Sequence, residues 1–268
     1  MEEKECQEDF NLKDYKVNKV SLWEKLDKKK FLIIVVILLL ILLIIISTIL
    51  IVVSVGGKKE EELLLPSIGE FTCEYSAQDL TKKIQIISKD FNKKTGFQMI
   101  FNDKVIGYTK ELKFDKNSIF IIFRLQENIN MDSMFKDVSS LVSISFTSAK
   151  DAKITSMIST FENCNHLENI NINGFNTENI KSMHKLFKRT NIQNLSMRKF
   201  NTKNVEDMSY MFAESNIKDI DFSSIDVRSV KNISHMFDNC YYLEKLDLSP
   251  FNINTNTKNV IYMSYMFY

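Results

Sequence analysis

The chain has 268 residues, with 35 Lys and Arg against 34 Asp and Glu, which gives a net charge of +1 at pH 7. Its length allows one large domain or two small ones, and the balanced charge argues against nucleic-acid binding, which usually requires a basic domain. The scarcity of Gly (6) and Pro (2) argues against a hairpin-rich β-sandwich or a collagen-like repeat.

The N-terminal part predicts a membrane anchor. Residues 1–30 form a tail that is too short for a domain, and residues 31–55 carry no charge. As a helix, this run would cover roughly 37 Å, against a hydrocarbon core of about 30 Å. It is also longer than the apolar part of a cleaved signal peptide. We therefore expect a single transmembrane signal anchor, followed by a stalk over residues 56–70.

Lysine residues cluster before the apolar run, whereas only Lys58 and Lys59 follow it closely. The positive-inside rule then predicts a cytoplasmic N-terminus. The C-terminal part is expected outside the cell or in a lumen, with the cell surface as the favoured location.

Residues 71–130 predict a small β-rich domain. Its β-rich segments lie at 83–88, 97–102, 104–108 and 118–125, and Asn102-Asp103 suggests a tight hairpin turn. The last segment is apolar on both faces and is therefore expected to be buried on both. We interpret this region as the N-terminal cap of the repeats that follow.

From residue 131 onward, a five-residue motif returns six times, as MDSMF, MISTF, MHKLF, MSYMF, ISHMF and MSYMF. An L-x-x-L-x-L pattern follows each of the first five copies, and F-N-T comes next at residues 175 and 200. Apolar residues at i, i+3 and i+4 of the motif fit one face of a helical turn. A period near 25 with this pattern is typical of a leucine-rich-repeat solenoid.

The expected fold is therefore α/β: a leucine-rich-repeat-type solenoid with one short parallel strand and one short helical turn per repeat. It would span residues 131–268 with five to six units, the last of them incomplete, after the small β domain and the transmembrane helix. The Met and Phe residues at the repeating positions would form its core.

The consensus M-S-x-M-F-x-x-C-x-x-L-x-x-L-x-L-S-x-F-N-T-x-N-V resembles the BspA-type leucine-rich repeats of surface proteins from mycoplasmas, other bacteria and protists. This resemblance covers residues 131–268 and departs from the consensus at residues 224–227, where SIDV stands. It implies surface display and, for some members, adhesion or binding of host proteins. It implies no catalytic residues.

The sequence predicts no enzyme, cofactor or metal site. The common catalytic and phosphate-binding motifs are absent, and His166, His184 and His235 stand at three different repeat positions. Cys164 and Cys240 share one repeat position three rungs apart, roughly 14 Å, which is too far for a disulfide. We expect both to be buried, free and structural.

The exposed face of the strands is the candidate partner-binding site, because side chains that flank the inward residues point outward. Its first two columns are Asn169, Asn194, Asp219 and Lys245, then Asn171, Ser196, Asp221 and Asp247. For any single residue, a merely solvated face remains the alternative. Asn194 and Asn232 also lie in glycosylation sequons, which matter only in a eukaryotic secretory pathway.

These features together predict a single-pass, membrane-anchored surface protein whose repeats recognise a protein or cell-surface ligand, as in adhesion. The alternative is a membrane-tethered scaffold or receptor subunit that acts through its cytoplasmic tail. The expected partners are the membrane and such a ligand, and not nucleic acid.

Overall fold

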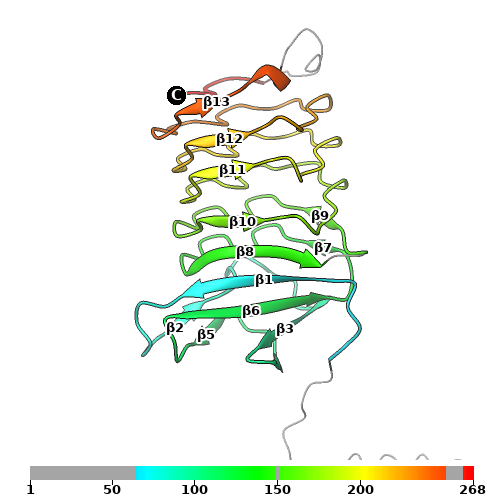
Figure 1. The fold of residues 1–268 in the computed structure, drawn as a ribbon, viewed down its shortest axis with the longest axis vertical. Coiled ribbons are helices and arrows are strands. Elements are labelled where there is room, and N and C mark those ends of the chain that lie inside the picture. Colours follow the sequence, from blue (N-terminus) through cyan, green and yellow to red (C-terminus); the bar gives the residue numbers. More distant parts are fainter. Residues whose placement is uncertain (1–63, 149–150, 252–261) are drawn as a thin grey trace, which may run out of the picture. The chain divides into compact units, whose positions relative to one another are not determined.

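The computed structural model describes residues 64–148, 151–251 and 262–268 (Figure 1). The predicted tail, the membrane segment over 31–55 and the first part of the stalk lie outside these ranges. Within them, no helix has the length and apolar character needed to cross a membrane. The structure does not support the expected single-pass anchor or the cell-surface location derived from it, and neither is retained.

The capping region consists of short strands around an aromatic core. Its strands are β1 (Gly69–Ser76), β2 (Lys83–Gln85), β3 (Phe97–Phe101), β4 (Lys104–Ile106), β5 (Glu111–Lys113) and β6 (Ser118–Leu125). Phe71 of β1 stacks on Phe123 of β6 with ring centroids 4.8 Å apart, and both side chains are fully buried. The expected hairpin turn is confirmed between β3 and β4, since Asn102 and Asp103 both adopt positive φ angles.

One sheet joins the capping region to the first repeats. Its strand order is β10-β8-β1-β6-β3-β4, where β8 spans Leu141–Ser148 and β10 spans Asn169–Asn171. The strands from β8 to β4 pair antiparallel, whereas β8 and β10 pair parallel. The sheet therefore changes from antiparallel to parallel pairing where the repeats begin.

Strand β6 is buried on one face only, contrary to the prediction that both of its faces are buried. Ile119, Ile121 and Phe123 point into the core, but Phe120 on the opposite face is 58% exposed. No second layer covers this face of the strand in the described part of the chain, because the repeats continue the sheet sideways instead of packing on it.

The repeats stack as parallel rungs above this sheet (Figure 1). Their remaining strands are β7 (Ile129–Asn130), β9 (Ile154–Ser156), β11 (Asn194–Ser196), β12 (Asp219–Asp221) and β13 (Lys245–Leu246), with a 3-10 turn η1 (Ser249–Phe251). Strands β11, β12 and β13 form a second, three-stranded sheet, and β7 pairs with β9. Strands β8, β10, β11, β12 and β13 follow one another along the same side of the stack, whereas β7 and β9 form a separate pair.

The M-S-x-M-F motif forms a tight turn, so the predicted helical turn is wrong. Tyr210 and Phe212 donate their backbone N–H groups to carbonyls of the next rung, at 3.0 Å each, instead of to a carbonyl four residues back. The third residue of every copy has a positive φ, as Tyr210 does at 57°, and a right-handed helix cannot continue through it.

The expected α/β leucine-rich-repeat solenoid is consequently not what the described part of the chain forms. The described residues contain strands, turns and η1, and no α-helix. The inward-facing pattern that suggested a helix is nevertheless real, because Met208, Met211 and Phe212 are all buried. Inward-facing residues at positions i, i+3 and i+4 fit this tight turn as well as they fit a helical turn.

The phenylalanines of the motif form a stacked column through the core. Each ring lies nearly parallel to the next, and the centroid spacing decreases from 5.9 Å to 5.5 Å along the column. The residues in this column are Phe135, Phe161, Phe187, Phe212, Phe237 and Phe267. Neighbouring rungs thus cover the apolar faces that a single rung would leave exposed.

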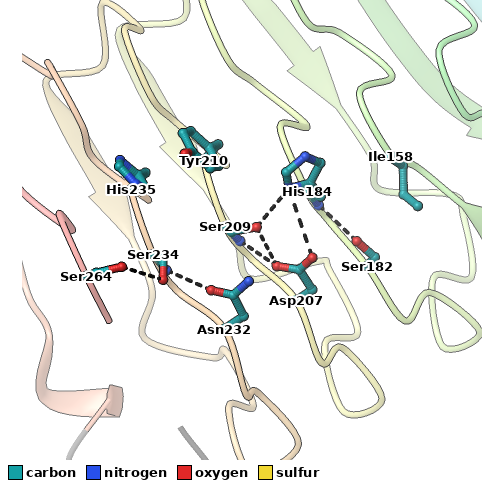
Figure 2. A pocket seen from close by; sticks show the side chains of 10 residues that line it. All are labelled: Ile158, Ser182, His184, Asp207, Ser209, Tyr210, Asn232, Ser234, His235 and Ser264. Atoms are coloured by element: carbon teal, nitrogen blue, oxygen red, sulfur yellow. Dashed lines mark hydrogen bonds and ion pairs between the residues drawn. The ribbon is translucent and has the colours of Figure 1, made fainter. Parts of the chain in front are cut away.

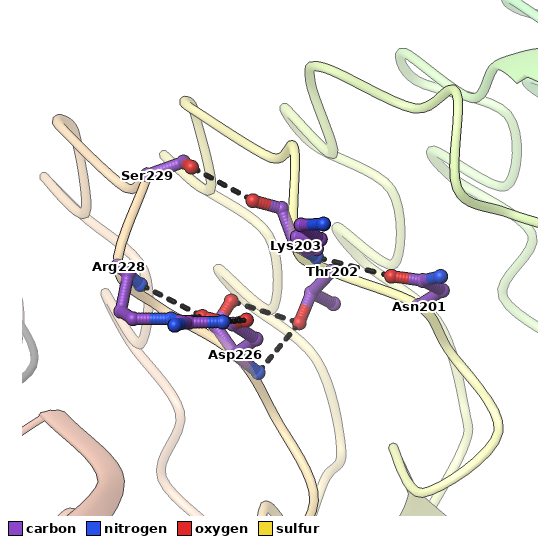
Figure 3. A network of polar contacts seen from close by, with 6 residues as sticks. All are labelled: Asn201, Thr202, Lys203, Asp226, Arg228 and Ser229. Carbon is purple, nitrogen blue, oxygen red and sulfur yellow. Dashed lines mark hydrogen bonds and ion pairs between the residues drawn. The ribbon is translucent and has the colours of Figure 1, made fainter.

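The F-N-T segment forms a corner of each rung, where hydrogen bonds from a threonine side chain take the place of backbone–backbone hydrogen bonds to the next rung (Figure 3). The buried Thr202 hydroxyl donates to the Asp226 carbonyl at 2.9 Å and accepts from the Asp226 N–H at 2.8 Å. Thr177 makes the same pair of contacts with Asn201 one rung earlier. The Asn201 and Asp226 side chains each accept a hydrogen bond from the backbone N–H two residues on, which holds the corner in shape.

Candidate functional site

The structure aligns the predicted columns on the exposed face of the strands. Asn194 is the Cα partner of Asp219, and Asp219 is the Cα partner of Lys245. In the second column, Ser196 is paired with Asp221 in the same way. Both columns are interrupted between β10 and β11, which belong to different sheets.

The second column shapes the turns that follow the strands. Asn171, Asp221 and Asp247 each accept the backbone N–H two residues on, at 2.8–3.0 Å, and Ser196 does so at 3.4 Å. Because these oxygens hold the chain's own backbone, they are less available to a partner.

Asp221 has further partners on the neighbouring rung. Arg198 lies 2.6 Å from its carboxylate, and the Ser196 hydroxyl donates to it at 3.3 Å. Hydrogen bonds from Ser223, together with the Arg198 charge, hold the pKa of Asp221 below its usual value. Asp221 is therefore ionised at neutral pH and already paired.

The first column differs because its side chains are unengaged. Within the described residues, Asn169, Asn194, Asp219 and Lys245 make no side-chain hydrogen bond and no ion pair. Asn169, Asn194 and Lys245 are exposed, and Asp219 is half-buried. These four side chains can therefore contact a partner without breaking an internal interaction.

The first column continues into the capping region through a row that the sequence did not reveal. Asn169 pairs in register with Ser143, Ser143 with Glu74, and Glu74 with the exposed Phe120. The Ser143 hydroxyl donates to Glu74 at 3.0 Å. The signal for Phe120 was the alternation in SIFIIFRL, in which Ser118 and Arg124 lie on the same face as Phe120.

The two sequon residues occupy different environments. Asn194 is exposed on the strand face. Asn232 is half-buried, and its side-chain oxygen accepts the Ser234 N–H at 3.1 Å.

A separate groove lies along the turns that carry the repeat motif (Figure 2). It has a volume of about 430 Å³ and spans several rungs. Its lining residues are Ile158, Ser182, His184, Asp207, Ser209, Tyr210, Asn232, Ser234, His235 and Ser264. His184 and His235 stand at different repeat positions, as the sequence indicates, but stacking of the rungs brings both into this groove.

Ser209, His184 and Asp207 form a connected cluster that lacks the geometry of a catalytic triad. The Ser209 hydroxyl donates to Asp207 at 2.6 Å, and Nδ1 of His184 lies 2.7 Å from the same hydroxyl oxygen. Since the hydroxyl proton points to Asp207, Nδ1 must be the donor to Ser209. In a triad, the histidine instead accepts the hydroxyl proton and the carboxylate binds its other nitrogen.

The cysteines that the structure describes occupy structural positions, and Cys73 and Cys164 are buried whereas Cys240 is half-buried. Cys164 and Cys240 each donate to the carbonyl of a core phenylalanine one rung earlier, at 2.9 Å and 3.0 Å. Both are free thiols as predicted, but only Cys164 is buried as expected, and Cys73 is a third free thiol. Burial raises the pKa of the Cys240 thiol to about 11.

Part of the chain is similar to a known protein family. Residues 129–251 match the family model described as "Mycoplasma protein of unknown function, DUF285", which covers a little under half of the chain. No curated protein matches the chain. No solved structure matches it either.

Proposed function

We propose that this protein binds a protein partner through the exposed face of its stacked strands. The observation that carries the proposal is the unengaged first column, in which Asn169, Asn194, Asp219 and Lys245 are presented at one position of successive strands. Stacked repeats commonly use such a surface for binding, because it is extended and its shape is fixed by the rungs beneath it.

The adjoining row in the capping region supplies the apolar contact that a polar column lacks. Phe120 is more than half exposed at the end of the row that starts from Asn169. Exposed aromatic side chains surrounded by polar groups are typical of the residues that contribute most to protein–protein binding.

The repeat motif gives independent support. It resembles BspA-type repeats, and binding of host proteins is implied for some members of that family. The alternative function, a scaffold or receptor acting through the N-terminal tail, depends on residues outside the described ranges, and no structural observation favours it.

Site-specific photo-cross-linking in cells that express the full chain tests the proposal. A photoreactive amino acid at Asn194 should cross-link one protein reproducibly, whereas the same amino acid at Lys203 should not. Lys203 is a suitable control because it is also exposed but lies at the F-N-T corner. Equal labelling from both positions, or none from Asn194, would reject the strand face as the binding surface.

A further inference from the structure

The groove along the motif turns has polar groups whose hydrogen-bonding capacity is only partly used. The Asn232 side-chain oxygen accepts the Ser234 N–H, but its Nδ2 group has no partner among the described residues. One oxygen of Asp207 accepts both the N–H and the hydroxyl of Ser209. Its other oxygen lies 4.0 Å from His184 and is free to accept a further hydrogen bond.

His184 and Ser182 give the groove a further hydrogen-bond acceptor and a further donor. Because Nδ1 of the neutral imidazole donates to Ser209, its Nε2 is an acceptor. Burial lowers the pKa of His184, so the ring is neutral at pH 7. The Ser182 side-chain oxygen accepts a hydrogen bond from the backbone N–H of His184 at 3.2 Å. The hydroxyl proton of Ser182 therefore remains available to donate to a ligand.

Donors and acceptors therefore alternate from rung to rung. Ser182, Asp207 and Asn232 occupy the same position on three consecutive rungs and are joined by parallel backbone bridges. Neighbouring strands lie about 4.8 Å apart, so the side chains of Ser182, Asp207 and Asn232 follow one another at about that spacing. Figure 2 shows these side chains along one side of the groove.

The lining excludes several classes of ligand. No Lys or Arg lines the groove itself, although the ammonium groups of Lys185 and Lys188 lie 6.0 Å and 5.5 Å from the ring centroid of Tyr210. An anion in the groove would lie beside the carboxylate of Asp207, which disfavours it. Apolar ligands are also disfavoured, because Tyr210 and His235 stack on each other at 4.3 Å and cover the ring faces that such a ligand would use. The backbone N–H groups of Met183 and Met208 are already bonded to neighbouring rungs, so an extended peptide finds no free main chain to pair with.

We propose that this groove binds a neutral carbohydrate, with Asp207 accepting a hydrogen bond from one sugar hydroxyl and Asn232 donating to an adjacent hydroxyl. A hydroxyl group both donates and accepts, so neighbouring hydroxyls on one ring satisfy an acceptor and a donor placed side by side. The hydroxyls of Ser182, Ser234 and Ser264 extend the same chemistry along the groove. This site uses none of the residues of the strand face, so it stands or falls independently of the proposed partner binding.

Two substitutions that preserve shape test the proposal. Asp207→Asn replaces the free acceptor by a donor, and Asn232→Asp replaces the free donor by an acceptor. In each variant, the other side-chain oxygen can still accept the backbone bond that holds the turn. Asn117→Asp, the same kind of change at an exposed residue just before β6 and outside both proposed surfaces, is the matched control.

The full chain is screened on an array of neutral oligosaccharides built from glucose, galactose, mannose and N-acetylglucosamine, and the strongest binder is then titrated in solution. Saturable binding is expected, weakened at least tenfold by Asp207→Asn and by Asn232→Asp and unchanged by Asn117→Asp. The absence of saturable binding to every oligosaccharide, or equal loss in all three variants, would overturn the proposal. So would Asp207-dependent binding of a peptide from a random library when no sugar binds.

Discussion

Replacing Thr202 by valine should destabilise the repeat stack through the loss of two hydrogen bonds at one corner. The Thr202 side chain is 1% exposed and bonds both the N–H and the carbonyl of Asp226. Valine has nearly the same shape, and Val227 already occupies the equivalent position of the next rung with 2% exposure. Packing should therefore be preserved while both bonds are lost.

The expected cost is about 2 kcal/mol, since each lost neutral hydrogen bond contributes about 0.5–1.5 kcal/mol and the abandoned groups are partly buried. For a folded unit of this size, that corresponds to a decrease in Tm of roughly 4–8 °C, measured by circular dichroism on the full chain. Thr202→Ser retains the hydroxyl and loses one buried methyl group, so it should cost about 1 kcal/mol. A valine variant that melts within 1 °C of the wild type, or above the serine variant, would refute this explanation of the F-N-T motif.

Three further measurements test other features of the fold. Ser133 has a φ of 55°, a strained angle for any residue except glycine, so Ser133→Gly should raise the free energy of unfolding by about 0.5–1 kcal/mol. Ser139 has an ordinary φ, so Ser139→Gly should lower the free energy of unfolding. The opposite order of the two variants in thermal melts would contradict backbone strain at Ser133. Burial lowers the pKa of His184 in the folded state, so its contribution to stability is complete above the unfolded pKa of about 6.5 and decreases as the pH falls toward the folded pKa. The wild type should therefore lose more Tm than His184→Asn between pH 7.5 and pH 5, and equal losses would disprove that contribution. Cys164 is fully buried with a raised pKa, so iodoacetamide should label it only after denaturation, as peptide mass mapping can determine; labelling of the native chain would contradict its placement.

Periodicity in the sequence located the repeat and its core but not the backbone conformation. The spacing of Met208, Met211 and Phe212 predicted which side chains point inward, and all three do. The same spacing suggested a helix because a tight turn with one left-handed residue places the same side chains inward. Bulky aromatic residues disfavour a positive φ, so the presence of a tyrosine at Tyr210 did not indicate the left-handed conformation found there.

The candidate site was predicted in part for a similar reason. Alternation along the strands placed Asn194 and Ser196 on the exposed face, as found. It could not tell that Ser196 is engaged by its own turn and the next rung while Asn194 is not, because those contacts depend on how the rungs are aligned. The exposure of Phe120 was missed because the apolar run around it resembles a strand buried on both faces.

The most direct test of partner binding is a competition experiment on the cross-linking reaction at Asn194. Unlabelled wild-type chain should suppress the cross-link, and a chain with Lys203→Glu should suppress it equally well. A chain carrying Asn169→Arg and Asn194→Arg should require at least a tenfold higher concentration, because two long charged side chains would then occupy the first column. If this double variant competes as well as the wild type, the first column does not form the binding surface.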